Sequence, residues 1–309
     1  MDPYVSIVVV TYNRMEDTRR VMARLRKHAD PRVEVIVIDN ASTDGCAEMI
    51  EKEFPDMKLV RCKKNYGIPS YNRGFDVARG EIIVVINNDS YPAADTIGRI
   101  IDFFGKNKNV GILQGRIMNI ISRDLFYPPR QELRTRKLLC DFVVAGAAIR
   151  KEVLSTVGHF PASTFLFGAE HDLCLRALSA GYEIEYCDDI LFYHLHRPEY
   201  MPSLFNPFFY HVRSYYWIIW RRYPFLKALD STIWLTFVLL KRAFRERKLK
   251  ILFYATMDAF RKLPLILGER KPVEMEFIKR SEDFFPSLSN LSVLGKLKQR
   301  LAALRKPLL

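Results

Sequence analysis

The sequence predicts an α/β fold, with a mostly parallel central sheet flanked by helices and a basic helical extension at the C-terminal end. Short aliphatic runs alternate with segments of helical periodicity through the first third of the chain, which is the pattern of repeated strand–helix–strand units. Most of these runs end in clusters of Asn, Asp, Ser and Thr, as strands do when they lead into a ligand crevice. The 309 residues allow one large domain with an appendage, and we expect the boundary near residue 204.

Continuous apolar runs predict strands that are buried on both faces of a parallel sheet. These runs are residues 5–10 (VSIVVV), 33–38 (VEVIVI), 59–62 (LVRC), 82–86 (IIVVI) and 110–113 (VGIL). Helical spacing of the apolar residues between the runs predicts helices over residues 19–28, 46–54, 75–78 and 96–104. Gly80 is expected to cap the third of these helices.

The stretch EIIVVINNDS at 81–90 carries the first candidate for chemistry. Asp89 follows a predicted strand directly, so its carboxylate would stand at the mouth of the crevice and could hold a divalent cation. The alternative is a strand-terminating turn, because Asn, Asp and Ser are also turn residues. Asp39 ends the second strand and is a second ligand candidate, whereas residues 42–44 also suit a helix N-cap.

The distal half of the expected catalytic domain begins with residues 114–140, which are irregular and rich in arginine. A long loop of this kind is either a substrate lid or a solvated excursion. Further helices are predicted over residues 151–157 and from 170 to a capping glycine at 181, followed by strands at 182–186 and 190–193.

Glu170 and His194 are the candidates of this half. Glu170 lies at a helix N-terminus, where it could serve only the helix dipole. Because an apolar segment precedes it, Glu170 could instead have the raised pKa that a general base needs. His194 and His196 face opposite sides of an extended segment, so only one of them can reach a shared site, and a surface histidine is the default interpretation.

Several other classes are excluded by missing signals. No glycine-rich dinucleotide or P-loop motif follows the first strand. Five scattered cysteines without a C-x-x-C pair argue against a disulfide framework and a zinc site, and suit a reducing cytosol. No basic leader precedes residues 5–10, and no stretch approaches the roughly 20 apolar residues of a membrane-spanning helix. The sequence therefore predicts neither a signal peptide nor a membrane span.

The net charge of +13 lies entirely in the last part of the chain. Residues 1–196 contain 26 Lys and Arg and 26 Asp and Glu, whereas residues 197–309 contain 22 and 9. Residues 205–250 predict two helices broken near Pro224, and residues 291–304 predict a short basic helix.

The two longer helices are amphipathic. On the first, one apolar face is predicted, with Trp217 and Trp220 beside it as interfacial residues. On the second, a stripe is formed by Leu226, Leu229, Ile233, Phe237, Leu240 and Phe244, and Lys and Arg residues crowd its end. This pattern favours docking on an anionic membrane surface. The alternatives are packing on the catalytic domain or across a homo-oligomer, and no nucleic acid is expected because no recognised nucleic-acid motif is present.

Five segments in this order resemble glycosyltransferase family 2, the inverting nucleotide-sugar transferases with a GT-A fold. They are VSIVVVTYNR at 5–14, VIVIDNASTDG at 35–45, NYGIPSYNRG at 65–74, GEIIVVINNDS at 80–90 and FLFGAEHDLCLRALSAGYEIEYCDDILFYHLH at 165–196. Within the family the chain is most similar to the rhamnosyltransferase and galactofuranosyltransferase branch, which builds bacterial surface polysaccharides. The resemblance implies a catalytic domain at 1–204, with a nucleotide-binding half to about residue 110 and an acceptor half from 111, followed by the helical region at 205–309.

The resemblance also implies site residues. Glu170 would be the catalytic base, and Asp89 with His194 would hold Mg²⁺ or Mn²⁺ at the position of the family's Asp-x-Asp motif, whose first carboxylate is here the amide of Asn87. The donor would be bound by Thr11, Tyr12, Asn13, Arg14, Asp39, Asn40, Ser42, Asn65, Gly67, Asn72, Asn87, Asn88 and Asp172.

The implied reaction is metal-assisted transfer of a sugar from a nucleoside-diphosphate sugar, of the dTDP-rhamnose or UDP-sugar type, to a hydroxyl of a glycan or polyprenyl-linked acceptor. The expected location is cytoplasmic and peripheral on the inner face of the plasma membrane. A nucleotidyltransferase is the alternative enzyme, although TYNRMED after the first strand is not its Gly/Lys/Arg-rich phosphate loop. The non-enzymatic alternative is a homologue that binds nucleotide sugars or lipids without turnover.

Overall fold

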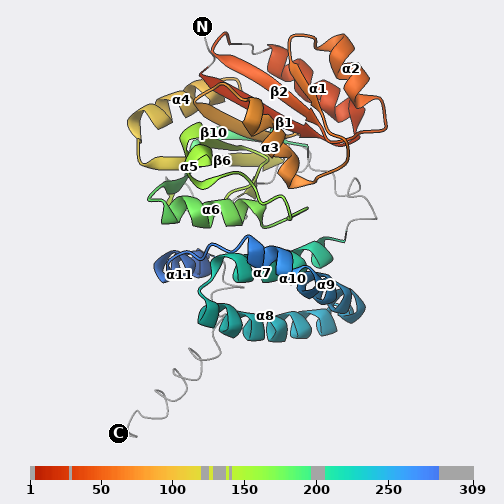
Figure 1. Cartoon of the computed structure of the whole chain (residues 1–309). Coiled ribbons are helices and arrows are strands. Elements are labelled where there is room, and N and C mark those ends of the chain that lie inside the picture. The colour runs from red at the N-terminus through yellow and green to blue at the C-terminus, as the bar shows by residue number, and fades with distance from the viewer. Residues whose placement is uncertain are drawn as a thin grey trace, which may run out of the picture. The chain divides into compact units, whose positions relative to one another are not determined.

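A computed structural model of the chain describes residues 4–27, 30–119, 125–127, 137–138, 141–195 and 206–284 (Figure 1). The chain divides into two compact units. Unit 1 consists of Met1–Phe165 and Ala169–Ser203, and unit 2 consists of Leu166–Gly168 and Leu204–Leu309. The division of the first unit into a nucleotide half and an acceptor half stays a prediction.

Unit 1 is built on one mixed sheet in the order β3-β2-β1-β4-β9-β6-β10-β5, with β7 beside β6 and β8 beside β10. Its longest pairings, those of β1 with β2 and β4 and of β6 with β10, are parallel. The strands are β1 (Val5–Thr11), β2 (Val33–Asp39), β3 (Lys58–Arg61), β4 (Ile82–Asn87), β5 (Ser90–Pro92), β6 (Val110–Asn119), β7 (Leu125–Tyr127), β8 (Lys137–Leu138), β9 (Ala147–Arg150) and β10 (Glu183–His194).

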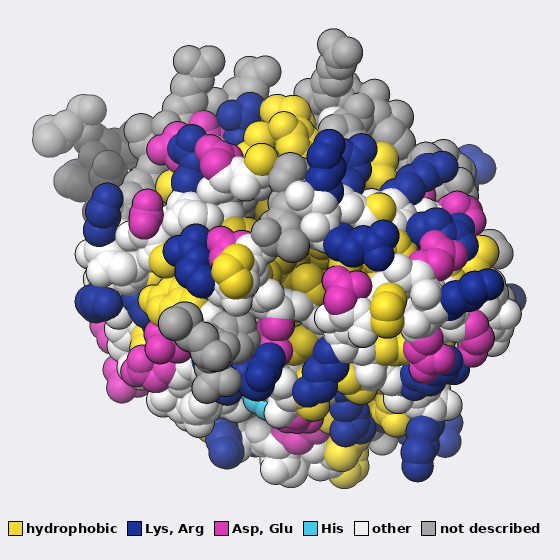
Figure 2. Space-filling model, turned by 90° about the horizontal axis from the view of Figure 1, so that it is seen from above, with side chains coloured by type: hydrophobic (Ala, Val, Ile, Leu, Met, Phe, Trp, Pro, Cys, Tyr) yellow, Lys and Arg dark blue, Asp and Glu magenta, His cyan; other side chains and the backbone are white. Residues whose placement is uncertain are grey.

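Helices flank this sheet, as predicted. They are α1 (Met15–Lys27), α2 (Cys46–Glu53), α3 (Tyr71–Val77), α4 (Thr96–Lys106), α5 (Lys151–Val157) and α6 (Ala169–Ser179), with a 3₁₀ turn, η1 (Ile68–Ser70), before α3. In the view of Figure 2, basic and acidic side chains are interspersed over the surface.

The core lies where the continuous apolar runs predicted it. β1 is hydrogen-bonded on both sides, to β2 and to β4, and Val8, Val9, Val84 and Val85 are fully buried. Burying each such side chain stabilises the fold by about 1.5–3 kcal/mol. The parallel block therefore forms a rigid support for the loops at its carboxyl edge.

The segment after β6 differs from the prediction of an irregular loop over residues 114–140. β6 continues to Asn119, and the short strands β7 and β8 pair antiparallel with β6 and β10. β9, which was not predicted as a strand, enters antiparallel between β4 and β6. Its Ala147, Ala148 and Ile149 are buried on both sides by these neighbours.

Other boundaries were also predicted wrongly. The two strands expected at 182–186 and 190–193 are one strand, β10, because a bulge between Cys187 and Leu191 keeps the pairing with β6. α1 begins earlier than expected, since the Asp44 side chain accepts a hydrogen bond from the Met15 backbone N–H. Gly80 does not cap α3. A Cβ there would lie 2.6 Å from the Ser6 backbone nitrogen, so its role is close approach to β1.

Unit 2 is helical, and the expected break near Pro224 separates α7 from α8. Asn206 caps α7 by accepting hydrogen bonds from the backbone N–H groups of Phe208 and Phe209. The helices are α7 (Pro207–Arg222), α8 (Phe225–Arg245), α9 (Leu249–Arg261), α10 (Leu263–Gly268) and α11 (Met275–Phe284). Within the described part of the chain, no helix is long and apolar enough to cross a membrane. The helix predicted at 291–304 lies outside the described residues.

The two tryptophans of α7 were wrongly predicted to be interfacial. Trp217 is 1 % exposed and donates its indole N–H to the Ala259 carbonyl oxygen, so it joins α7 to α9. Trp220 is also buried. Two arginines of the same helix are buried with carboxylate partners, Arg213 with Asp258 and Arg221 with Glu269. α7 is therefore the core helix of unit 2.

Candidate active site

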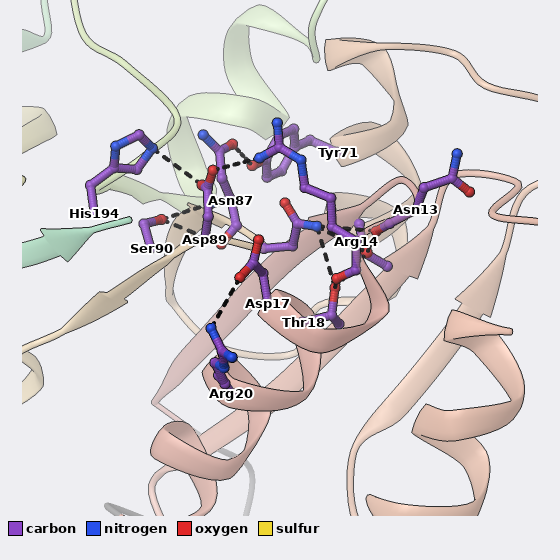
Figure 3. Close-up of polar contacts among 12 residues, drawn as sticks. Asn13, Arg14, Asp17, Thr18, Arg20, Tyr71, Asn87, Asp89, Ser90 and His194 are labelled. Carbon is purple, nitrogen blue, oxygen red and sulfur yellow. Dashed lines mark hydrogen bonds and ion pairs between the residues drawn. The ribbon is translucent and has the colours of Figure 1, made fainter. Parts of the chain in front are cut away.

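The carboxyl ends of β1, β2 and β4 lie side by side at one edge of the sheet. In the parallel register Thr11 pairs with Asp39, and β4 runs beside β1 on its other side. Because β5 pairs antiparallel with β10, His194 lies opposite Ser90. The polar residues that follow distant strands in the sequence therefore meet in one place (Figure 3).

Asp89 is at the centre of this cluster. Its carboxylate accepts a hydrogen bond from Arg14 Nη1 at 2.9 Å on Oδ2, and His194 Nε2 lies 3.2 Å from Oδ1. Asp89 is 6 % exposed and His194 is 4 % exposed. Burial acts to raise the pKa of Asp89, but the hydrogen bond and charge of His194 and the charge of Arg14 outweigh it and lower the pKa. Asp89 is thus held as a carboxylate between two nitrogen groups.

The two asparagines before Asp89 build the turn. The Asn87 backbone N–H donates to Ser90 Oγ at 2.9 Å, which closes the turn after β4. The Asn88 amide nitrogen lies 3.3 Å from both Thr11 Oγ1 and Thr18 Oγ1, so it ties the turn to β1 and α1. The turn interpretation and the site interpretation are compatible, because the asparagines make the turn and Asp89 is left at the site.

The loop after β1 carries two residues in the left-handed region, Asn13 at φ 57° and Arg14 at φ 61°. This conformation is uncommon for residues other than glycine and persists only where surrounding contacts hold it. Here the Asn13 backbone N–H donates to Ser42 Oγ, and its side-chain oxygen accepts from the Thr43 N–H, both at 2.9 Å. Tyr12 remains partly exposed. The loop directs Arg14 onto Asp89.

The end of β2 is joined to the loop before α3 through a pair of amides. Asn40 Nδ2 donates to Asn65 Oδ1 at 2.9 Å, and Asn40 Oδ1 accepts from the Tyr66 backbone N–H at 2.9 Å. Beside them, the Ser42 backbone N–H lies 3.3 Å from both carboxylate oxygens of Asp39. These residues are brought to the same edge, and their contacts with a nucleotide stay predictions.

Gly67 has a steric reason to be glycine. Its φ is +67°, and a Cβ would lie 1.9 Å from the Phe165 carbonyl oxygen. The next residue, Ile68, donates its N–H to that same oxygen at 2.8 Å. Gly67 therefore allows the loop to pack directly on the backbone that precedes α6.

Glu170 lies in the first turn of α6 and is half-buried. Burial raises its pKa from 4.5 to about 7, the range suited to a general base near neutral pH. A second carboxyl group, that of Asp141, lies near it and 4.0 Å from His171 Nδ1. Burial and then the charge of Glu170 raise the pKa of Asp141 well above its usual range.

Asp172 and Asn72 serve the scaffold rather than the cluster around Asp89. Asp172 is fully buried and accepts a hydrogen bond from Arg176 Nε at 2.9 Å, and Arg176 in turn donates to the carbonyls that follow α5. Asn72 exchanges two hydrogen bonds with the Phe160 backbone, at 2.8 and 3.1 Å. These hydrogen bonds are internal to unit 1, and the assignment of both residues to donor binding stays a prediction.

Tyr71 and Asp141 were not among the site residues predicted from the sequence. The Tyr71 hydroxyl donates to the Ile86 carbonyl and lies 3.0 Å from Asn87 Oδ1 (Figure 3). Burial, and then the negative charges of Asp89 and Glu170, raise the pKa of its phenol. The charges of both carboxylates therefore act on Tyr71. Its only signal was its position inside NYGIPSYNRG, whereas Asp141 follows no strand that was predicted from the sequence.

A separate cavity of about 780 Å³ lies in unit 1 between α1, β2 and α4, where Arg24 and Ile97 are among its lining residues. Asp89, Glu170 and His194 do not line it. Volume alone therefore does not locate the candidate site, which is defined by its side chains.

The chain is similar to known glycosyltransferases in sequence and in fold. Residues 6–162, about half of the chain, match the sequence profile of glycosyl transferase family 2. Glycosyltransferase AglE of Haloferax volcanii is 23 % identical over 215 residues, which are 63 % of this chain and 68 % of AglE. Dolichol-phosphate mannosyltransferase of Pyrococcus furiosus is 26 % identical over 169 residues, 50 % of this chain and 48 % of that protein. The chain thus spans about half to two thirds of the length of these relatives.

Among solved structures, the mannosyltransferase PcManGT from Pyrobaculum calidifontis in complex with GDP-Man and Mn²⁺ superposes with a TM-score of 0.54 at 17 % identity. The superposition covers 98 % of this chain and 81 % of that one. The likeness confirms a fold of the GT-A type.

Proposed function

Because the chain belongs to glycosyl transferase family 2, we propose that it is an inverting enzyme that transfers a sugar from a nucleoside-diphosphate sugar to an acceptor hydroxyl. The observation that carries the proposal is that two carboxylates of unit 1, Asp89 after β4 and Glu170 at the start of α6, have pKa values shifted in opposite directions. The pKa of Asp89 is lowered by His194 and Arg14, whereas the pKa of Glu170 is raised by burial, and the charges of both act on Tyr71. Such a separation assigns one group to charge and the other to proton transfer.

In the proposed reaction Glu170 accepts the proton of the acceptor hydroxyl while that oxygen forms a bond to the anomeric carbon. The bond from the anomeric carbon to the nucleoside diphosphate breaks on the opposite face, and the diphosphate leaves with the bonding electron pair. A pKa of about 7 keeps much of Glu170 ionised at neutral pH and still basic enough to take a proton. Burial, and then the charge of Glu170, raise the pKa of Asp141 well above its usual range, so the protonated form of that neighbour is favoured beside an ionised Glu170.

The donor set fits a divalent cation. Asp89 Oδ1 and His194 Nε2 approach to 3.2 Å, and a carboxylate with an imidazole suits Mn²⁺ or Mg²⁺ when diphosphate oxygens supply further ligands. No group of three His, Cys, Asp or Glu forms a ready-made metal site among the described residues. When bound, the cation would supply the charge that offsets the leaving diphosphate.

Arg14 gives the site a second source of positive charge. It already pairs with Asp89 at 2.9 Å and comes from the strained loop after β1. An incoming diphosphate competes with Asp89 for this guanidinium, since Arg binds phosphate oxygens in the same bidentate manner as a carboxylate. We therefore assign Arg14 to the diphosphate.

For the substrates we propose a donor of the dTDP-rhamnose or UDP-sugar type and a glycan or polyprenyl-linked acceptor of bacterial surface polysaccharide synthesis, used at the inner face of the plasma membrane. The donor class rests on the likeness of residues 80–90 and 165–196 to the rhamnosyltransferase and galactofuranosyltransferase branch. The lipid-linked acceptor is supported by the relative whose name includes dolichol phosphate.

The test is a panel of nucleotide sugars incubated with Mn²⁺ and a polyprenyl-phosphate or glycan acceptor, read as nucleoside diphosphate release. Release with one donor class, lost on chelation and in Glu170→Gln, is the expected result. Release of pyrophosphate from a nucleoside triphosphate would instead indicate a nucleotidyltransferase. Nucleotide binding without turnover on any donor would indicate a non-catalytic homologue.

A further inference from the structure

α8 exposes its apolar stripe, whereas a surface helix usually buries such a stripe. Its outward stripe consists of Leu226, Leu229, Ile233, Phe237, Leu240 and Phe244, whose exposed fractions lie between 40 and 78 %. The face that it buries consists of three small residues, Ala228, Ser231 and Ala243, and of two leucines, Leu235 and Leu239. Amphipathic helices of soluble units place their larger apolar side chains inward. The outward stripe of α8 therefore has a use outside the core of unit 2.

The neighbouring helix α9, which contacts both α7 and α8, also exposes large apolar side chains. Its Ala259 carbonyl oxygen accepts the indole N–H of Trp217 in α7, and its Phe253, Tyr254 and Met257 are more than half exposed. We call these three side chains and the outward stripe of α8 the α8–α9 apolar face. Exposed apolar patches of this extent mark protein or membrane contacts.

The charge around the face is positive. Residues 225–268 contain nine Lys and Arg and three Asp and Glu. Two of the three acids are neutralised locally: Glu246 pairs with Arg242 and Lys248, and Asp258 pairs with Lys262 and with a buried arginine of α7. The exposed cations Lys241, Arg245 and Lys250 lie at the end of the α8 stripe. The partner should therefore be apolar and anionic.

A bilayer with anionic headgroups has both properties, whereas a second copy of this chain would present the same positive charge. Close approach of like charges opposes self-association through this face. We propose that the α8–α9 apolar face lies in the interface of an anionic membrane, with its apolar side chains below the headgroups and its basic residues among them. This inference does not depend on the proposed sugar transfer.

The experiment is co-flotation of the full chain with vesicles of phosphatidylcholine, with or without phosphatidylglycerol, at low and high salt. The full chain should float with the phosphatidylglycerol vesicles and bind less at high salt. Phe237→Ser should lower the partition coefficient at least about tenfold, because a buried phenylalanine contributes roughly 2 kcal/mol. Met275→Ser, which removes an exposed apolar side chain from α11, is the matched control and should bind like the wild type.

The charge is tested by Lys241→Glu with Arg245→Glu, which should reduce binding at least about tenfold if each cation near the surface contributes roughly 1 kcal/mol. Its control is Lys106→Glu with Lys108→Glu, the same charge change on exposed residues of unit 1. Circular dichroism verifies that each variant is folded. Absence of flotation at low salt overturns the inference, as does a dimer, seen by light scattering, that Phe237→Ser dissociates.

Discussion

Replacing Glu170 by Gln should remove activity and stabilise the fold at alkaline pH. The displacement of its pKa from 4.5 to about 7 corresponds to roughly 3 kcal/mol of preference for the protonated form in the folded state. A raised carboxyl pKa contributes stability that is fully present below about 4.5 and is lost as the pH rises through about 7. The wild type should lose this contribution between pH 4.5 and 8, whereas the neutral amide should not.

Because Glu170 is only half-buried, solvent screening reduces this contribution to the free energy of unfolding from about 3 to roughly 1–2 kcal/mol. In a unit of about 200 residues this corresponds to a Tm higher by about 3–6 °C at pH 8, with no difference near pH 4.5. Activity of the variant should fall about 10²–10⁴-fold, and the wild-type rate should rise with pH through about 7.

The assay is thermal melting from pH 4.5 to 8 beside nucleoside diphosphate release over the same range. Glu81→Gln, which alters an exposed carboxylate of unit 1, is the control and should change neither measurement. If Glu170→Gln retains full activity at saturating donor and acceptor, the group is not the base. If its Tm follows the wild-type pH curve, Glu170 does not have a raised pKa.

Three further predictions concern the strand ends. Asp89→Asn should abolish stimulation by Mn²⁺, measured as nucleoside diphosphate release, and a variant that is still stimulated would exclude Asp89 as a ligand. Arg14→Gln should raise the affinity for Mn²⁺ in the absence of nucleotide about tenfold, because it releases the Asp89 carboxylate from a charged hydrogen bond worth about 1.5–3 kcal/mol. Electron paramagnetic resonance of free Mn²⁺ measures this affinity. An unchanged affinity would contradict the idea that Arg14 and the cation compete for Asp89. Gly67→Ala should destabilise unit 1 by more than about 2 kcal/mol in urea melts, since its Cβ would meet the Phe165 carbonyl. Gly98→Ala in α4, where a Cβ meets nothing within 4 Å, should instead stabilise by about 0.5–1 kcal/mol.

The sequence predicts the parallel block well because its signals are local. Continuous aliphatic runs can only be buried strands or helices, and their short length with polar ends favours strands. β9 gives no such signal. Its apolar residues Ala147, Ala148 and Ile149 form too short a run to show whether they belong to a strand or to the beginning of α5. Its antiparallel place between β4 and β6 depends on the whole sheet, so no local pattern could reveal it.

Periodicity identifies an apolar face without saying what covers it. α7 and α8 both show such a face in the sequence, yet α7 buries it while α8 exposes it. The discriminating feature was the opposite side of each helix. α7 has Trp217 and Trp220 outside that face, and it is buried on nearly every side, whereas α8 is buried only along Ala228, Ser231, Leu235, Leu239 and Ala243. A helix with large apolar side chains on more than one side is the one that becomes central.

The same distinction applies to the acidic residues of α6. Glu170 and Asp172 are two positions apart, so they point to different sides of the helix. The sequence shows two carboxylates near a helix N-terminus, and only the fold separates them. Asp172 is paired with Arg176 inside unit 1, whereas among the residues that the structure describes no cation pairs with Glu170, and burial raises its pKa.

The pair of Arg14 and Asp89 joins residues that are 75 positions apart, and it changes how the site is understood. With Arg14 in place, the carboxylate that would hold a cation is already neutralised. A cation arriving alone must displace the guanidinium, whereas a cation arriving with a diphosphate brings the anion that the guanidinium can accept instead. The first route loses a charged hydrogen bond, and the second exchanges it for another. Metal and donor should therefore bind with positive cooperativity, and the size of that coupling is set by the strength of the Arg14–Asp89 contact.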